Sequence, residues 1–527
     1  MIIYATCLLQ ISCVYYSTPK PNPSRSASRK SSEVHPVRKA IEPQLQLGEV
    51  DPSQVIFDLR SRDEITKLLI GAQHIYRTGE LREKVLAILR RIVPDDVDAE
   101  NGRPGMPLWT IFVLATIRLN CNLDYDQLKE LADYHRNIRE MVGHDRFDQS
   151  LYALQTLKDN VRLLTPEILD EINQLVVQAG HDLVMPGKNQ ELDGKYDSFV
   201  IETDVHYPTD ANLLFDALHK AICLTAPLCM LFGIGGWRQA DHNLKTIKQL
   251  LRTTQQVKRS TSTDARKKEL QEQKIRQAYE SYLDAAGEYV ARVQTSIEQI
   301  RQQTRECEST LTVIISCVNH AQRQMNQIRR RVLEGETIPH EEKVFSIFEE
   351  YTEWICKGKA GVPFELGLPV AVVTDQYSFI LHHRVLQHQV DRQAAPAVTR
   401  EAQERFPALR SCSYDKGCWS PENRQELEGL LELAVLPRTG RPSQADRERE
   451  STDEFVTRRR QHAAVESAIN AIENHGLDRC LDHGLCGFCR YVALAVVGRN
   501  LQILGEIIQK RQVALRKRQQ KSARLVA

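Results

Sequence analysis

The chain has 527 residues, and its 70 Lys and Arg residues balance 69 Asp and Glu residues, which gives a formal net charge of +1. This length exceeds what one hydrophobic core supports, so we expect two or more domains, and the neutral balance excludes a protein that is polybasic throughout. The thirteen scattered cysteines lack the regular spacing of a disulfide framework and favour reduced thiols in a cytosol.

The first 45 residues differ in composition from the rest of the chain. Residues 1–16 are apolar but interrupted by Gln10 and Ser12, lack the basic start of a signal peptide and are short for a membrane-spanning helix. Residues 19–43 carry Pro, Ser, Arg and Lys with almost no large apolar side chain, a composition that cannot offset its ordering entropy. We expect a disordered tail at 1–45, and a start codon assigned too far upstream is the preferred explanation.

Helical periodicity dominates residues 55–184. Apolar residues at three- and four-residue spacing predict helices over 62–77 and 79–92. Further helices are expected over 108–119 and 125–142. The short turn between the last two resembles a helix-turn-helix, although any helical hairpin has the same pattern. We interpret residues 46–190 as a helical DNA-binding domain, chiefly because of motifs that lie further along the chain.

A strand and a long helical segment follow. Aromatic and β-branched residues predict a strand over 196–203, which contains Asp197, and a helix is expected over 211–224. From 237 to 345 the chain is rich in Gln, Arg, Lys and Glu with scattered apolar residues, which predicts a long helical hairpin or coiled-coil-like insertion. Its charged faces are interpreted as solvated surface, with an arm that contacts DNA or dimerises as the alternative.

The remaining elements alternate between strands and helices. Strands are predicted over 368–374 and 377–386, joined by Asp375 and Gln376 as a two-residue hairpin turn. Asp415 comes directly after a predicted strand at 409–414. The other expected elements are a helix over 398–406, a helix over 421–431, a strand over 432–436, helices over 447–477 and 488–512, and a basic tail at 511–527.

Three acids on three separate predicted elements are candidates for a metal-binding site: Asp197, Asp415 and Glu466. Mg²⁺ prefers carboxylate oxygens, and a two-metal site activates a nucleophile and stabilises the leaving oxygen of phosphoryl transfer. Each acid also has an ordinary explanation: a strand-end residue, the start of a turn that Gly417 completes, and a solvated helix charge. Spacing alone does not choose between these interpretations.

Several motifs occur in a fixed order. Asp-Ser-Phe-Val-Ile-Glu-Thr at 197–203 precedes His-Tyr-Pro-Thr-Asp at 206–210, Tyr-Asp-Lys-Gly at 414–417 precedes Ser-Pro-Glu-Asn at 420–423, and Val-Leu-Pro-Arg-Thr-Gly-Arg follows at 435–441. This set resembles the DDE transposases of bacterial insertion sequences, most closely the ISNCY-like group. Similar segments at 357–360, 364–367, 461–470, 475–480, 490–495 and 499–501 extend the resemblance over residues 46–510.

The resemblance implies an α/β (α+β) fold. An RNase H-like catalytic core, a mixed sheet with flanking helices, is expected at 191–236 and 346–510. The helical domain at 46–190 precedes this core, and the helical insertion at 237–345 interrupts it.

The resemblance also implies a catalytic triad that binds Mg²⁺ or Mn²⁺, formed by Asp197, Asp415 and Glu466. Asp204 is the main rival for the first acid, but it lies beyond the strand. Asp375 is a weaker rival for the second acid and is explained by its hairpin turn.

Basic residues near the acids are candidates for contacts with the DNA backbone. The guanidinium groups of Arg458, Arg459 and Arg460 suit phosphate oxygens, with a solvated basic turn as the alternative. His462 lies one helical turn before Glu466, where it is placed to touch a phosphate or orient the carboxylate, unless it is simply packed or solvated. Lys416 beside Asp415 is the last candidate. Some relatives have Arg and Lys where this chain has His462 and Glu473.

A zinc site is considered at Cys480, Cys486 and Cys489, with His483 between them. The Cys-x-x-Cys pair has the spacing of half a site, but no second half is recognisable, so zinc is not expected.

The resemblance implies a transposase that binds terminal inverted repeats, hydrolyses a phosphodiester to release a 3′-hydroxyl, and uses this hydroxyl to attack target DNA. It is expected to act as a homo-oligomer on DNA, in the bacterial cytoplasm at the nucleoid and without a membrane. The alternatives are a metal-dependent nuclease that cuts without joining and a catalytically inactive DNA-binding remnant.

Overall fold

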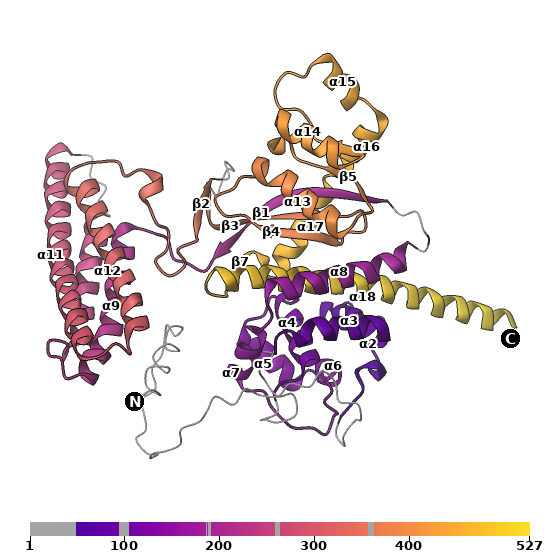
Figure 1. The fold of residues 1–527 in the computed structure, drawn as a ribbon, viewed down its shortest axis with the longest axis horizontal. Coiled ribbons are helices and arrows are strands. Elements are labelled where there is room, and N and C mark those ends of the chain that lie inside the picture. The colour runs from indigo at the N-terminus through magenta and orange to yellow at the C-terminus, as the bar shows by residue number, and fades with distance from the viewer. Residues whose placement is uncertain are drawn as a thin grey trace. The chain divides into compact units, whose positions relative to one another are not determined.

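The structure, a computed structural model, describes residues 49–93, 105–185, 187, 191–258, 264–356 and 363–526 (Figure 1). The tail expected at 1–45 and the segment 357–360 lie outside this part of the chain. The chain divides into two compact units. We call Val205–Thr352 the helical unit, and the described residues before and after it the sheet unit.

The sheet unit begins with seven helices: α2 (Glu64–Arg77), α3 (Gly79–Arg90), α4 (Leu108–Asn120), α5 (Tyr125–Tyr134), α6 (Arg136–Met141), α7 (Leu154–Val161) and α8 (Pro166–Val184). The helices predicted over 62–77, 79–92 and 108–119 are confirmed. The single helix predicted over 125–142 is wrong, because His135 has an extended backbone between α5 and α6. Its ring accepts a hydrogen bond from the Ile138 N–H, so His135 caps a new helix.

The sheet has seven strands: β1 (Leu192–Thr203), β2 (Glu353–Cys356), β3 (Phe364–Thr374), β4 (Ile380–Val385), β5 (Leu409–Ser413), β6 (Leu433–Val435) and β7 (Arg479–Cys480). The long strand β1 is central, since it pairs antiparallel with β3 and parallel with both β5 and β7. β3 is antiparallel to β2 and β4, and β5 is parallel to β6. The predicted mixed sheet of an α/β fold is confirmed.

The predicted hairpin of β3 and β4 is confirmed, but its two-residue turn is wrong. Thr374 pairs with Ile380, so five residues connect the strands. The carboxylate of Asp375 accepts hydrogen bonds from the N–H groups of Tyr377 and Phe379, at 2.8 and 2.9 Å. An aspartate that bonds its own following backbone builds a longer turn, a local competition that strand periodicity does not reveal.

Helices of the second half of the sheet unit are α13 (Asp391–Arg405), α14 (Pro421–Leu430), α15 (Gln444–Glu450), α16 (Asp453–Gln461), α17 (Ala464–Ile472) and α18 (Leu485–Val526). The single helix predicted over 447–477 is wrong, because the chain breaks into α15, α16 and α17. The second break falls at His462, which ends α16. α18 packs along α2, α8 and α4 and runs well beyond the predicted limit of residue 512.

Two glycines mark the crossing of α2 and α18. A Cβ atom at Gly71 would lie 2.1 Å from the carbonyl oxygen of Leu501, and one at Gly505 would lie 1.8 Å from that of Lys67. The helices therefore touch backbone to backbone, which a larger side chain at either position would prevent.

The helical unit contains α9 (Asp210–Leu231), α10 (Ala240–Lys258), α11 (Ala265–Gln303) and α12 (Glu308–Ile328). α9, which the sequence analysis placed in the catalytic domain, packs against the other three helices. They share a core that includes Leu214, Tyr282, Ile297 and Leu311.

Two helices in the described residues, α9 and α18, are long and apolar enough to cross a membrane. The apolar stretch is 50% buried in α9 and 78% buried in α18.

Candidate active site

Asp197 lies within β1, and Asp415 lies two residues beyond the end of the adjacent parallel strand β5. Lys195 of β1 lies opposite Ser413 of β5, and each acid follows two residues later along its strand direction. Side chains two residues apart lie on the same face of a strand, and neighbouring strands are about 4.8 Å apart. The fold therefore brings together two acids that are far apart in the sequence.

The two acids have different surroundings. Asp197 is half-buried and accepts a hydrogen bond of 2.8 Å from the Ser198 N–H. The pKa of Asp197 is raised to about 6, chiefly by burial and also by the negative charges of Asp415 and Asp391. The hydrogen bond from Ser198 and the nearby His462 oppose this rise. The side chain of Asp415 is 71% exposed. Its hydrogen bond with His462 lowers the pKa of Asp415.

His462 joins α16 to strand β5. Its Nε2 lies 3.1 Å from Oδ1 of Asp415, and its Nδ1 lies 3.0 Å from the hydroxyl oxygen of Ser413. The imidazole is largely buried, with 12% of the side chain exposed. In the tautomer that donates from Nε2 to Asp415, Nδ1 accepts from the Ser413 hydroxyl, so both ring nitrogens are satisfied and the ring orientation is fixed.

A second contact lies one helical turn earlier. The guanidinium of Arg458 pairs with the carboxylate of Asp193, which also accepts a hydrogen bond of 2.7 Å from the Ser411 hydroxyl. Asp193 and Ser411 stand opposite each other on β1 and β5. The contacts of His462 lie further toward the C-terminal end of β5 than this pair does. The helix α16 therefore runs parallel to β1 and β5, from their N-terminal toward their C-terminal ends.

Glu466 comes one turn after His462, at the same spacing that separates Arg458 from His462. It lies on α17, which packs against β1 and buries Val465, Ile469 and Ile472. Glu466 itself is exposed. The structure thus brings the first two acids together and places the third on a neighbouring helix that packs against β1.

The predicted DNA-binding residues have separate roles in the structure. Arg458 is engaged by Asp193 and His462 by Ser413 and Asp415. Arg459, Arg460 and Lys416 have exposed side chains, and the carbonyl of Lys416 accepts a 2.9 Å hydrogen bond from the Thr439 hydroxyl.

The rival acids are held elsewhere. Asp204 is exposed beyond the end of β1, 3.7 Å from the guanidinium of Arg479. Asp375 is buried where β3 ends, and its carboxylate lies 2.6 Å from Nε2 of His181. Two backbone N–H groups also donate to this carboxylate, so Asp375 stabilises the hairpin turn.

Asp391 was missed by the sequence analysis. It is the first residue of α13, and its Oδ1 lies 3.4 Å from the buried hydroxyl of Tyr196. Its charge is among those that raise the pKa of Asp197. No motif marks Asp391 in the sequence. An acid at the start of a helix is usually explained by its favourable interaction with the helix dipole, so the sequence gives no reason to assign it another role.

Carboxylate oxygens around Asp197 fit a hard divalent cation such as Mg²⁺ or Mn²⁺ by donor type. Among the residues that the structure describes, no group of three or more His, Cys, Asp or Glu side chains is close enough to hold a metal ion. Cys486 and Cys489 belong to no such group, and the thiol of Cys480 lies 3.5 Å from the Asp482 carbonyl oxygen.

Comparisons of the chain with protein-family models, with curated proteins and with solved structures found no match. The interpretation of the site therefore depends on the geometry of β1, β5, α16 and α17.

Proposed function

We propose that the protein is a DDE-type transposase that cleaves DNA at the ends of an insertion sequence and joins them to target DNA. The observation that carries this proposal is the proximity of Asp197 on β1 to Asp415, which lies just beyond the end of the parallel strand β5 and bonds to His462 at the end of α16. The next helix, α17, carries Glu466. The motif order along the chain points to the same three acids.

The topology of the sheet supports an RNase H-like core. Three strands, β4, β3 and β1, run antiparallel in turn, and β5 and β6 continue from β1 in parallel. α13 connects β4 to β5, and α14 connects β5 to β6. Asp415 then lies just beyond the C-terminal end of β5, where ligands of open α/β sheets bind, and Asp197 lies beside it within β1.

In this proposal Asp197, Asp415 and Glu466 hold Mg²⁺ or Mn²⁺. When bound, the ion activates a water or a 3′-hydroxyl and stabilises the leaving oxygen. The elevated pKa of Asp197 fits such a role, because a half-buried carboxylate beside other acids lacks a compensating positive charge. His462 holds Asp415 in place. The spacing of Arg458, His462 and Glu466 supports a position for Glu466 on the same side of the sheet.

The exposed cations Arg459, Arg460 and Lys416 are proposed to contact DNA phosphates beside the acids. Arg458 has a different task, since it anchors α16 to β1 through Asp193. The enzyme would act as a homo-oligomer on the inverted repeats and target DNA, in the cytoplasm at the nucleoid.

The proposal is tested with the full chain and duplex DNA that carries the ends of the element encoding it. Asp197→Asn, Asp415→Asn and Glu466→Gln are each expected to reduce Mg²⁺-dependent cleavage by about 10³-fold or more, because each removes a ligand of the reacting centre. Asp204→Asn is the matched control and should retain activity.

Three results separate the alternatives. Variants that are folded by circular dichroism yet still cleave and join DNA would overturn the assignment of the acids. Cleavage without joining would indicate a nuclease. A folded wild-type chain that binds DNA but never cleaves it with Mg²⁺ or Mn²⁺ would indicate an inactive remnant.

A further inference from the structure

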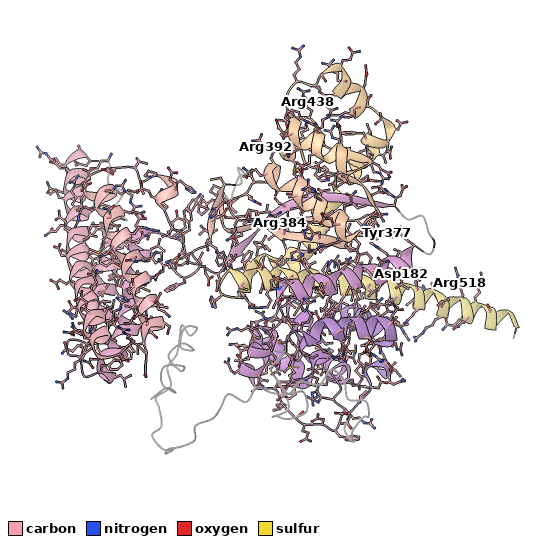
Figure 2. The ribbon with its side chains drawn as sticks, viewed as in Figure 1. Asp182, Tyr377, Arg384, Arg392, Arg438 and Arg518 are labelled. Carbon is pink, nitrogen blue, oxygen red and sulfur yellow. The ribbon has the colours of Figure 1, made fainter. Side chains whose placement is uncertain are left out.

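The C-terminal part of α18 extends beyond the packed part of the sheet unit. Side chains are largely buried in the helix up to residue 509, and every side chain from 514 to 522 is exposed. Figure 1 shows this end of the helix running past α8 and α2, and Figure 2 labels Arg518 on it. The guanidinium of Arg511 donates a hydrogen bond to the carbonyl of Leu183 at the end of α8. The base of the extension is therefore fixed to the folded unit.

Charge is segregated on this extension. No Asp or Glu occurs from residue 507 to the end of the chain, although the whole chain is almost neutral. By contrast, Lys84 on α3 and Lys510 earlier on α18 each pair with an acid one turn away, Glu80 and Glu506. The basic residues of the extension are Arg511, Arg516, Lys517, Arg518, Lys521 and Arg524.

This arrangement costs stability unless an anion compensates it. Lys517 and Lys521 are one turn apart, where like charges destabilise a helix by a few tenths of a kcal/mol. An isolated helix of about 15 residues is also marginal in water without packing. Among the side chains that the structure describes from 511 to 522, Leu515 is the one large apolar side chain that is exposed. This stretch therefore provides neither the apolar stripe that a partner helix needs nor enough area to enter a membrane surface.

We propose that residues 511–526 of α18 form an arm that binds the phosphate backbone of duplex DNA. Lys517, Arg518 and Lys521 occupy one side of the helix, and a separation of four residues is about 6 Å along the axis. Phosphates recur about every 3.4 Å along each DNA strand, so the arm meets several of them whatever the base sequence. Because α18 is continuous with the packed core, the fold sets the direction of the arm. The inference concerns DNA affinity and does not depend on the catalytic acids.

The test is a charge reversal in the full chain, Lys517→Glu, Arg518→Glu and Lys521→Glu together. The control reverses three exposed basic residues of α11 by the same total charge: Arg266→Glu, Lys267→Glu and Lys268→Glu. Binding to a fluorescent duplex of unrelated sequence is measured by anisotropy over roughly 50 to 200 mM salt. The arm variant should bind about tenfold more weakly, or worse, at the lowest salt. Its slope of log affinity against log salt should fall by about 2.7, because each phosphate that a side chain no longer neutralises lowers the slope by about 0.9.

The control should retain the wild-type affinity and slope. Equal effects of both variants would show that net charge alone governs binding and would overturn the proposal. Unchanged DNA binding by a folded arm variant would do the same, as would an arm variant that loses binding to vesicles of anionic lipid but not to DNA. Loss of duplex affinity with cleavage of end-containing DNA intact at high protein concentration would support the arm and leave the catalytic proposal standing.

Discussion

His462 makes more contacts within the candidate site than its neighbours do, because its one ring bonds to both Ser413 and Asp415 and so connects α16 to the end of β5. We expect His462→Ala to lower cleavage by about 10–100-fold, the usual effect of removing a partner that orients a metal-binding carboxylate. His462→Gln, which retains a hydrogen-bond donor, should recover part of the loss. Rates of cleavage at several Mg²⁺ concentrations measure this effect. Equal activity of wild type and His462→Ala would show that the contact has no role in catalysis.

Asp216 makes the stability of the helical unit depend on pH. Burial in α9 raises its pKa to about 7, and its Oδ2 lies 3.3 Å from Nε2 of His206. A folded-state pKa above the unfolded value near 4 gives stability that is complete below about pH 4 and lost as the pH rises through about 7. We expect Asp216→Asn to remove this loss, a difference of about 2–4 kcal/mol between roughly pH 5 and pH 8.

Urea unfolding of both proteins at the two pH values measures that difference. The lowered pKa of His206, also caused by burial, acts in the opposite direction but is present in wild type and variant alike. Parallel pH profiles of the two proteins would contradict the expectation for Asp216.

Single residues were predictable where a motif marked them. Asp197 and Asp415 were identified in this way, and the structure places them close enough for the charge of Asp415 to raise the pKa of Asp197. Asp391 was not, because its contact with Tyr196 depends on how α13 meets β1, which no local pattern encodes. The pairing of Arg458 with Asp193 joins residues 265 positions apart and was equally hidden.

At the scale of elements, the crossing of α2 and α18 gives a sharp prediction. Gly505→Ala should destabilise the protein by about 1–3 kcal/mol, because its Cβ would meet the Lys67 carbonyl oxygen at 1.8 Å and push the helices apart. Gly287→Ala on α11 is the matched control, since its nearest neighbour, Met325, lies at an ordinary 3.6 Å. The control should be stabilised by about 0.5–1 kcal/mol.

Thermal or urea unfolding measures both glycine variants. The order of stabilities, Gly287→Ala above wild type above Gly505→Ala, is the result expected. A Gly505→Ala protein as stable as wild type would mean that the two helices separate without cost.

Elements with strong periodicity were predictable, and their interruptions were not. The strand around Asp197 and the helix at 108–119 follow from their apolar patterns. The five-residue turn at Asp375 comes from a side chain that bonds to its own following backbone, and the break at His462 coincides with side-chain bonds to β5 and Asp415. Side-chain hydrogen bonds, both local and between elements, thus accompany the interruptions, and apolar periodicity does not reveal them.

The whole molecule consists of two units with separate cores, so we expect a fragment of residues 205–352 to fold alone. The packing of α9 with α10, α11 and α12 buries a contiguous apolar core without help from the sheet. Circular dichroism should show a helical fragment that unfolds cooperatively on heating. A fragment that is unstructured, or that aggregates at every temperature, would contradict this independence.

Gly367 of β3 lies between the two points at which the helical unit connects to the sheet. It pairs with Glu202, near the end of β1, and with Glu353, at the start of β2, so the chain leaves the sheet on one side of Gly367 and returns on the other. Two strand spacings, about 10 Å, separate the exit from the return. A linker of a few residues spans that gap at small entropic cost. The helical unit is therefore attached as an exchangeable module. It could be excised or replaced at this point while the strand that carries Asp197 keeps its pairings with β3, β5 and β7.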